Sequence, residues 1–305
     1  MTNIEFMTVD VFTRSHFAGN PLAVIPDARE LAPALMQRVA REFNYSETTF
    51  VLPPDDPAHT ARVRIFTPLE EIPFAGHPNV GTAYMLGRIG TAFGRRVGPR
   101  IVFEEVAGLV EVVLIYEGAT LTGAQFDAPH RLHLGDEIVA DLICECASLA
   151  RGDVRLGVHR PIMASVGLTF AIAELTSVEA LGRAQPNAAA FAAADARHPS
   201  PDTRFSLFLY AHVADDPLRL RARLLAPLTD LHEDPATGSA AAALGALLSG
   251  LPGSADGTRR IAVEQGIGIG RPSTMEVTTV TRHGTVERVS ISGMCAPVMR
   301  GTIEL

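Results

Sequence analysis

The stretch PFAGHPNVGTAYMLG at residues 73–87 decides the fold, together with EDPATGSAAAALGALL at residues 233–248. From His77 to Gly87, and again from Ser239 to Leu248, there is no lysine, arginine, aspartate or glutamate. A helix without a polar face has to be buried. The sequence therefore predicts one buried helix in each half of the chain.

The sequence around these helices has the pattern of many short strands. Strand-like residues open the chain at Ile4–Phe12, and apolar and polar residues alternate at Ala61–Ile65 and Leu218–Leu224. The pattern predicts an α+β fold in which sheets wrap around a central helix, twice. We interpret the chain as a diverged duplication with halves at 1–122 and 123–305; the last strand, about 295–305, could return to the first half.

The alternation at 218–224 also places Arg219, Arg221 and Arg223 on one face of a strand. Three arginines in this pattern could form an anion site. A solvated strand face is the commoner meaning of such alternation, and we expect that here.

Composition limits the class of protein. A chain of 305 residues is longer than most single-core domains, which favours two domains or two packed halves. The formal net charge of −8, without a dense basic patch, argues against nucleic acid as a partner and favours a small molecule. The N-terminus lacks a signal-like pattern, and no apolar run approaches about 20 residues. We expect a cytoplasmic protein that does not bind membranes.

No cofactor or metal is expected. The glycines of Gly266-Ile-Gly268-Ile-Gly270 lack the spacing of a dinucleotide-binding loop, so close backbone approach or bulges explain them better. The ten histidines show no metal-ligand spacing. Cys144, Cys146 and Cys295 are too few for a disulfide framework, and we expect structural thiols.

Both predicted helices begin at a turn that contains glycine and proline. A helix start offers unpaired N–H groups and the positive end of the helix dipole, so two such starts could together receive a carboxylate. Pro78 suits a first helical turn, and Thr237 or Ser239 could cap the second helix. Capping alone is the alternative interpretation of each turn.

Several strings together resemble the phenazine biosynthesis PhzF-like family. They are HFAGNPLAV (16–24), NYSETTF (44–50), RIFTPLEEIPFAGHPNVG (64–81), EDPATGSAA (233–241) and QGIGIGRPS (265–273). Their order and spacing match over the whole chain. The resemblance implies the diaminopimelate epimerase fold, with two similar halves, a site in the cleft between them, and a homodimer.

The resemblance also implies the chemistry. Related racemases use one cysteine thiol at each central helix start, but those positions correspond here to Gly76 and Ser239, which disfavours a two-thiol mechanism. PhzF-like enzymes instead use the glutamate of the SET string, which is Glu47, as the general acid and base of an isomerase without a cofactor. Taken without the resemblance, Glu47 would be interpreted as an exposed loop charge or as a partner of a helix end.

The remaining site residues follow from the same match. His77 and Asp234 are implied to touch the substrate or assist proton movement, although Asp234 could equally be a structural cap. Donors for a small cyclic amino- or hydroxy-carboxylate are implied at Ser46, Gly76, Gly238 and Ser239.

The segments Met163–Phe170 and Ala226–His232 differ from the family pattern, which leaves the substrate open. Two other functions therefore stay under consideration. One is an epimerase or racemase of a small amino acid, in which Glu47 works with another base. The other is a non-catalytic protein that binds small carboxylates.

Overall fold

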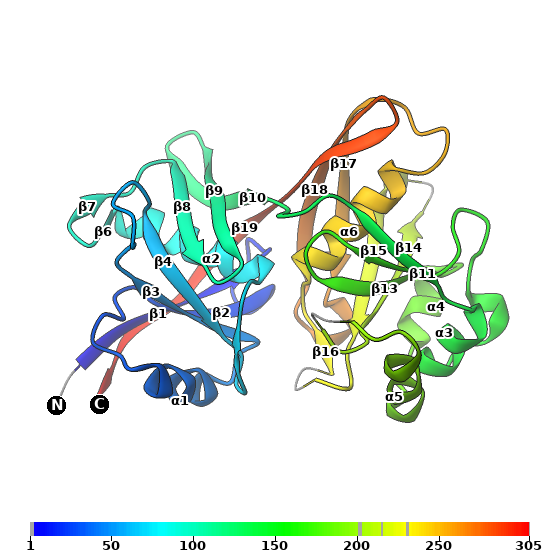
Figure 1. The fold of residues 1–305 in the computed structure, drawn as a ribbon, viewed down its shortest axis with the longest axis horizontal. Coiled ribbons are helices and arrows are strands. Elements are labelled where there is room, and N and C mark those ends of the chain that lie inside the picture. The colour runs from blue at the N-terminus through cyan, green and yellow to red at the C-terminus, as the bar shows by residue number, and fades with distance from the viewer. Residues whose placement is uncertain (1–2, 201–202, 215, 230–231, 305) are drawn as a thin grey trace. The chain divides into compact units, whose positions relative to one another are not determined.

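The structure is a computed structural model that describes residues 3–200, 203–214, 216–229 and 232–304 and forms two compact units (Figure 1). The first unit comprises Met1–Asp127 and Ser292–Leu305, and the second comprises Ala128–Ile291. The division thus falls between Asp127 and Ala128, where the sequence suggested 122 and 123. None of the described helices is long and apolar enough to cross a membrane.

A sheet that closes on itself makes up most of the first unit. Its strands are β1 (Asn3–Val11), β2 (Asn20–Ile25), β3 (Glu47–Leu52), β4 (Ala61–Phe66), β5 (Glu71–Ile72), β8 (Arg100–Glu105), β9 (Gly108–Glu117), β10 (Thr120–Asp127) and the end of β19 (Thr285–Glu304). The order is β19-β1-β2-β3-β4-β8-β9-β10, with β5 beside β4. Because β10 also pairs with β19, the sheet returns to its first strand.

Helix α2 (Gly76–Ile89) occupies the centre of this sheet. Every residue from Gly76 to Leu86 is buried, and the helix contacts β1, β2, β3, β9 and β10. At Gly81 a Cβ would lie 2.6 Å from Cδ2 of Leu22, so glycine lets the helix approach β2 closely. Helix α1 (Pro33–Phe43) packs with a separate apolar cluster, and β6 (Thr91–Ala92) and β7 (Arg95–Arg96) form a small hairpin.

The second unit repeats this design with extra helices. Its strands are β11 (His133–Glu137), β12 (Ile162–Ser165), β13 (Thr169–Glu174), β14 (Leu207–Val213), β15 (Asp216–Leu225), β16 (Glu233–Asp234), β17 (Gly257–Gln265) and β18 (Ser273–Arg282). Helix α6 (Gly238–Ser249) is buried along its whole length and contacts β12, β13, β17 and β18. Helices α3 (Ala140–Ala147), α4 (Val178–Arg183) and α5 (Ala188–Arg197) contribute to a second apolar cluster.

The pairing pattern shows that the two units are versions of one fold. In the first unit β1-β2-β3-β4-β8-β9 pair in the order antiparallel, parallel, antiparallel, parallel, antiparallel. In the second, β12-β13-β14-β15-β17-β18 pair in the same order. The predicted α+β fold, with a sheet rolled around a central helix in each half, is confirmed.

The match continues down to single residues at the helix starts. Arg64 forms a bidentate ion pair with Glu71 at 2.7 and 2.6 Å, and Arg223 does the same with Glu233 at 2.9 and 2.7 Å. Counting onward from each glutamate, EIPFAG (71–76) corresponds to EDPATG (233–238). The first residues of α2 and α6 are therefore equivalent glycines, and the second residues are His77 and Ser239.

The expectation of a solvated arginine face at 218–224 is wrong for Arg223. The side chain of Arg219 is 53% exposed, whereas that of Arg223 is only 14% exposed. Arg223 also donates to the carbonyls of Leu181 and Ala184 at 2.9 and 2.8 Å. Helix α4 and its C-terminal end cover this arginine, which alternation along a strand does not reveal.

Close backbone approach explains Gly266, as the sequence suggested. Gly266 has φ 75°, and a Cβ there would lie 2.6 Å from the carbonyl oxygen of Pro235. The segment beyond it forms one 3-10 turn, Ile267–Ile269, between β17 and β18. Of the divergent segment 226–232, residues 230 and 231 lie outside the described residues.

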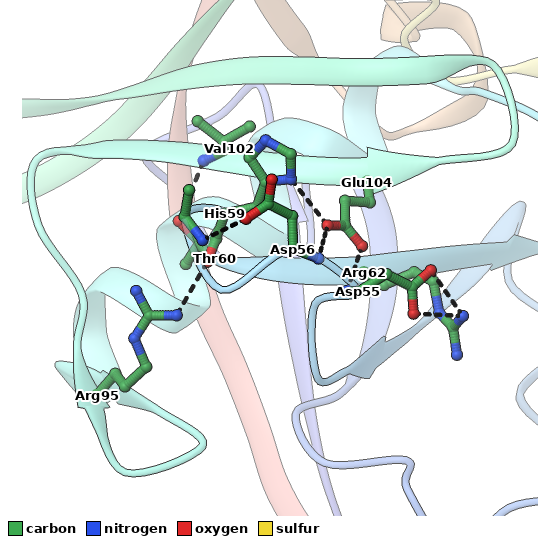
Figure 2. Close-up of polar contacts among 9 residues, drawn as sticks. Asp55, Asp56, His59, Thr60, Arg62, Arg95, Val102 and Glu104 are labelled. Atoms are coloured by element: carbon green, nitrogen blue, oxygen red, sulfur yellow. Dashed lines mark hydrogen bonds and ion pairs between the residues drawn. The ribbon is translucent and has the colours of Figure 1, made fainter.

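A cluster of polar residues surrounds Glu104 near the end of β8, as Figure 2 shows. Glu104 accepts hydrogen bonds from the N–H groups of Asp55 (2.7 Å) and Asp56 (2.8 Å), and lies 2.8 Å from Nδ1 of His59. Since side chains alternate along a strand, the next residue, Glu105, points to the opposite face, where it interacts with Asn79 of α2.

Candidate active site

The predicted base Glu47 is the first residue of β3. Helix α1 ends at Asn44 in a left-handed conformation, with φ 52°, and the chain then turns into the strand. Leu22 of the parallel neighbour β2 lies beside Glu47 in the sheet. The Glu47 side chain is only 15% exposed, so the alternative of an exposed loop charge is wrong.

His77 faces Glu47 from the start of α2. Its Nε2 atom lies 3.3 Å from Oε2 of Glu47, and its side chain is 6% exposed. Burial lowers the pKa of His77 to about 3, because the charged imidazolium would lose its hydration. His77 is therefore neutral near pH 7 and can offer a hydrogen bond without carrying a charge.

Asn20 and Ser46 extend this contact on the other side of the imidazole. Nδ2 of Asn20 lies 3.3 Å from Nδ1 of His77, and the hydroxyl of Ser46 donates to Oδ1 of Asn20 at 3.2 Å. Asn20 and Ser46 are both buried. Sequence reasoning did not assign Asn20 a role, although its place in the HFAGNPLAV string was an available signal.

The N-terminal end of α2 supplies backbone donors beside these side chains. Its N-cap position is Ala75, which has no side-chain oxygen to accept from the helix. Within the described part of the chain, no acceptor is found for the N–H groups of Gly76 and His77. Such N–H groups, at the positive end of the dipole, suit an anionic ligand group.

A second acidic residue lies near the same helix start. Burial raises the pKa of Glu105 to about 8, and the nearby side chain of Asn79 offsets only part of this rise. Glu105 thus holds a proton at neutral pH. No local sequence pattern distinguishes this glutamate, because its burial depends on how β8 packs against α2.

In the second unit, Asp234 belongs to a compact hydrogen-bonded cluster. The hydroxyl of Thr237 donates to Oδ2 of Asp234 at 2.7 Å. Gln265 donates to the carbonyl of Asp234 (2.8 Å) and to the Thr237 hydroxyl (3.1 Å), and accepts from the Thr237 N–H (3.1 Å). The cluster fixes the turn that leads into α6.

Neither Thr237 nor Ser239 caps α6 with its side chain, contrary to the prediction. Thr237 occupies the N-cap position, but its hydroxyl is directed to Asp234 and caps no helix N–H group. Ser239, the second residue of α6, is buried and is not the N-cap. Among the described residues no acceptor is found for the N–H groups of Gly238 and Ser239.

The structure therefore gathers the predicted residues into two groups, one in each unit. Ser46, Glu47, Gly76 and His77 lie together in the first unit, and Asp234, Gly238 and Ser239 lie together in the second. Among the described residues, no three or more His, Cys, Asp or Glu side chains form a group that could hold a metal ion.

Comparisons with known proteins agree over the whole chain. Residues 9–301 match the PhzC-PhzF family, described as phenazine biosynthesis-like protein. An uncharacterized isomerase of Mesorhizobium japonicum is 35% identical over 308 residues, covering 99% of both chains. A trans-2,3-dihydro-3-hydroxyanthranilate isomerase of Pseudomonas fluorescens is 32% identical over 301 residues, again covering 99% of both. A PhzF-family crystal structure from Bacillus anthracis has a TM-score of 0.88 at 22% identity and full coverage of both chains, which shows the shared fold.

Proposed function

This chain belongs to the phenazine biosynthesis-like PhzC-PhzF family and is an isomerase, and we propose that it moves a proton between two carbons of a small cyclic amino- or hydroxy-carboxylate. Glu47 acts as the general base and then as the general acid, without a cofactor. The observation that carries this proposal is the buried contact of Glu47 with a neutral His77 at the start of α2.

The proposed reaction needs one carboxyl group in two states. The Glu47 carboxylate takes a proton from one substrate carbon, and the electron pair left behind delocalises through the unsaturated ring. The resulting carboxylic acid then returns a proton to a second carbon on the same face of the ring. The imidazole of His77, 3.3 Å from the carboxylate, does not compete for the proton, since burial lowers the pKa of His77 and makes the neutral ring a very weak base.

We propose that the helix starts bind the substrate. The N–H groups of Gly76 and His77 in the first unit, and those of Gly238 and Ser239 in the second, are donors at positive dipole ends. Asp234 takes part in the same reaction, and its position is fixed by Thr237 and Gln265. The name of the Pseudomonas fluorescens relative supports a ring that carries amino, hydroxyl and carboxylate groups.

The test is to incubate the protein with trans-2,3-dihydro-3-hydroxyanthranilate and related cyclic amino-carboxylates in D2O and to follow the substrate by NMR. We expect a proton shift between two ring carbons, and a loss of turnover on the order of 10³-fold or more in Glu47→Gln. Glu111→Gln is a matched control, because Glu111 is an exposed carboxylate paired with Arg100. Unchanged turnover in Glu47→Gln would contradict the proposal.

The same experiment separates the alternatives. Isotope incorporation at a single stereocentre, without movement of a double bond, would identify an epimerase or racemase. Tight binding without exchange for any tested compound would identify a non-catalytic carboxylate-binding protein.

A further inference from the structure

Three buried side chains, with Glu47 at 15% exposure, form one line in the first unit. The line runs from the Ser46 hydroxyl to Oδ1 of Asn20 (3.2 Å), from Nδ2 of Asn20 to Nδ1 of His77 (3.3 Å), and from Nε2 of His77 to Oε2 of Glu47 (3.3 Å). These residues come from β2, from the start of β3 and from α2, so the sheet and its central helix fix them together.

The chemistry of each group sets the direction of the line. The carbonyl oxygen of a carboxamide only accepts hydrogen bonds and its NH2 group only donates them. Because the Ser46 hydroxyl donates to Oδ1 of Asn20, the NH2 group of Asn20 is the part that faces His77. Nδ1 of His77 must then accept, so it carries no proton.

A neutral imidazole without a proton on Nδ1 carries its proton on Nε2. That N–H is the group 3.3 Å from Oε2 of Glu47. The opposite tautomer would place an Nδ1–H against the NH2 group of Asn20 and a lone pair against the Glu47 carboxylate, which is unfavourable at both ends. Burial of the imidazole disfavours the doubly protonated form, so the two neutral tautomers are the ones to distinguish.

We propose that Asn20 is a positioning residue that holds His77 as the neutral Nε2–H tautomer, with its one N–H directed at the Glu47 carboxylate. This inference rests on the proposed role of Glu47 as the base. In this arrangement Nδ1 of His77 accepts from Asn20, and Nε2 carries the proton and lies 3.3 Å from Oε2 of Glu47, without a hydrogen bond among the described residues. His77 then has no free lone pair for the proton that Glu47 removes from the substrate. The transferred proton therefore stays on Glu47 until it is returned.

The resting enzyme gives a direct test that needs no substrate. Long-range proton–nitrogen correlation NMR of the 15N-labelled protein distinguishes the two tautomers and the imidazolium of each histidine, and His77→Gln identifies the signals of His77 among the ten histidines. We expect the Nε2–H tautomer across neutral pH. Detection of the Nδ1–H tautomer or of the imidazolium at pH 7 would overturn the proposal.

Two variants test the role of the carboxamide itself. Asn20→Asp replaces the NH2 donor by a carboxylate, which should draw a proton to Nδ1 and change the tautomer or charge of His77. Ser46→Ala removes only the hydroxyl that orients the amide, and it keeps the test available if Asn20→Asp folds poorly. We expect an altered His77 signal in both, and a loss of kcat in Asn20→Asp on the order of 10²- to 10⁴-fold, as when a catalytic histidine is set in the wrong tautomer.

Thr82→Val is the matched control. Thr82 lies on the same helix and shares a buried hydrogen bond with Thr49 of β3 (2.8 Å), so the variant removes a polar contact between the same two elements without touching His77. Its His77 spectrum should equal that of the wild type. An unchanged His77 signal in both Asn20→Asp and Ser46→Ala would contradict the proposal. By contrast, the expected tautomer in a protein inactive on every cyclic carboxylate would count against the proposed function alone.

Discussion

The starts of helices α2 and α6 are two versions of one structure with different chemistry. Both follow a Glu-x-Pro-x-x-Gly turn, and both are anchored by a bidentate arginine on that glutamate. At the second helical residue, however, α2 carries His77 and α6 carries Ser239. Duplication supplied two equivalent helix starts, and the contact of Glu47 with His77 is built on only one of them.

A second difference lies at the ends of β8 and β17, which lie near the starts of α2 and α6. In the parallel pair β4–β8, Arg62 stands opposite Glu104, and in the parallel pair β15–β17, Arg221 stands opposite Glu264. The next residues are Glu105 and Gln265. Gln265 uses its carboxamide as donor and acceptor around Thr237. A protonated Glu105 also has one donor and one acceptor oxygen. The first unit therefore has an uncharged acid at the position of the amide in the second, although among the described residues neither oxygen of Glu105 has a hydrogen-bond partner.

The largest expected effect comes from changing Glu105→Gln. Burial raises the pKa of Glu105 from 4.5 to about 8. The proton bound in the folded state stabilises the protein fully below the unfolded pKa, and this contribution is lost as pH rises through about 8. Between pH 5 and 9 the unfolding free energy of the wild type should therefore fall by up to about 4 kcal/mol through this group. Glu105→Gln should not show this loss.

Denaturant unfolding at several pH values measures this difference. Glu111→Gln, which removes an exposed carboxylate, should keep the pH dependence of the wild type. If Glu105→Gln and the wild type lose stability in parallel above pH 6, then Glu105 is ionised in the folded protein and the analogy with Gln265 fails.

The two anchoring arginines should differ in their contribution to stability. Arg223→Met leaves Glu233 and the carbonyls of Leu181 and Ala184 without their donor in a nearly buried place, which should cost about 3 kcal/mol. Arg64→Met breaks a more exposed pair, with side chains 22% and 29% exposed, and should cost about 1 kcal/mol. Thermal unfolding of both variants measures the difference, and equal losses would mean that burial does not distinguish the two anchors.

The sequence was sufficient for the architecture because burial leaves a pattern in composition. Two uncharged helical segments among alternating strands predicted both central helices, and α2 and α6 begin at Gly76 and Gly238, one residue before the predicted segments. The family strings identified the isomerase. The correspondence of EIPFAG with EDPATG was also present in the sequence, but only the shared strand register makes it meaningful.

The sequence was not sufficient for groups whose role depends on packing between distant segments. Asn20 and His77 are far apart in the chain, and nothing local indicates that a carboxamide will meet an imidazole. The same applies to Arg223, whose alternation resembled that of Arg219 although only Arg223 is covered by α4. Glu104 and Glu105 are adjacent in sequence, but only Glu105 turns toward α2.

A smaller effect than those of Glu105→Gln and Arg223→Met is expected from the reverse exchange, Gln265→Glu. An ionised glutamate keeps the acceptor for the Thr237 N–H but loses the donor to the Asp234 carbonyl, and it brings a negative charge close to Asp234. We expect a loss of about 2 kcal/mol at pH 7, measured by denaturant unfolding. The loss should shrink at acidic pH, because a protonated glutamate regains the donor. If Gln265→Glu is as stable as the wild type at pH 7, an acid is accepted at this position without cost. The amide of the second unit would then not be the counterpart of the buried acid of the first.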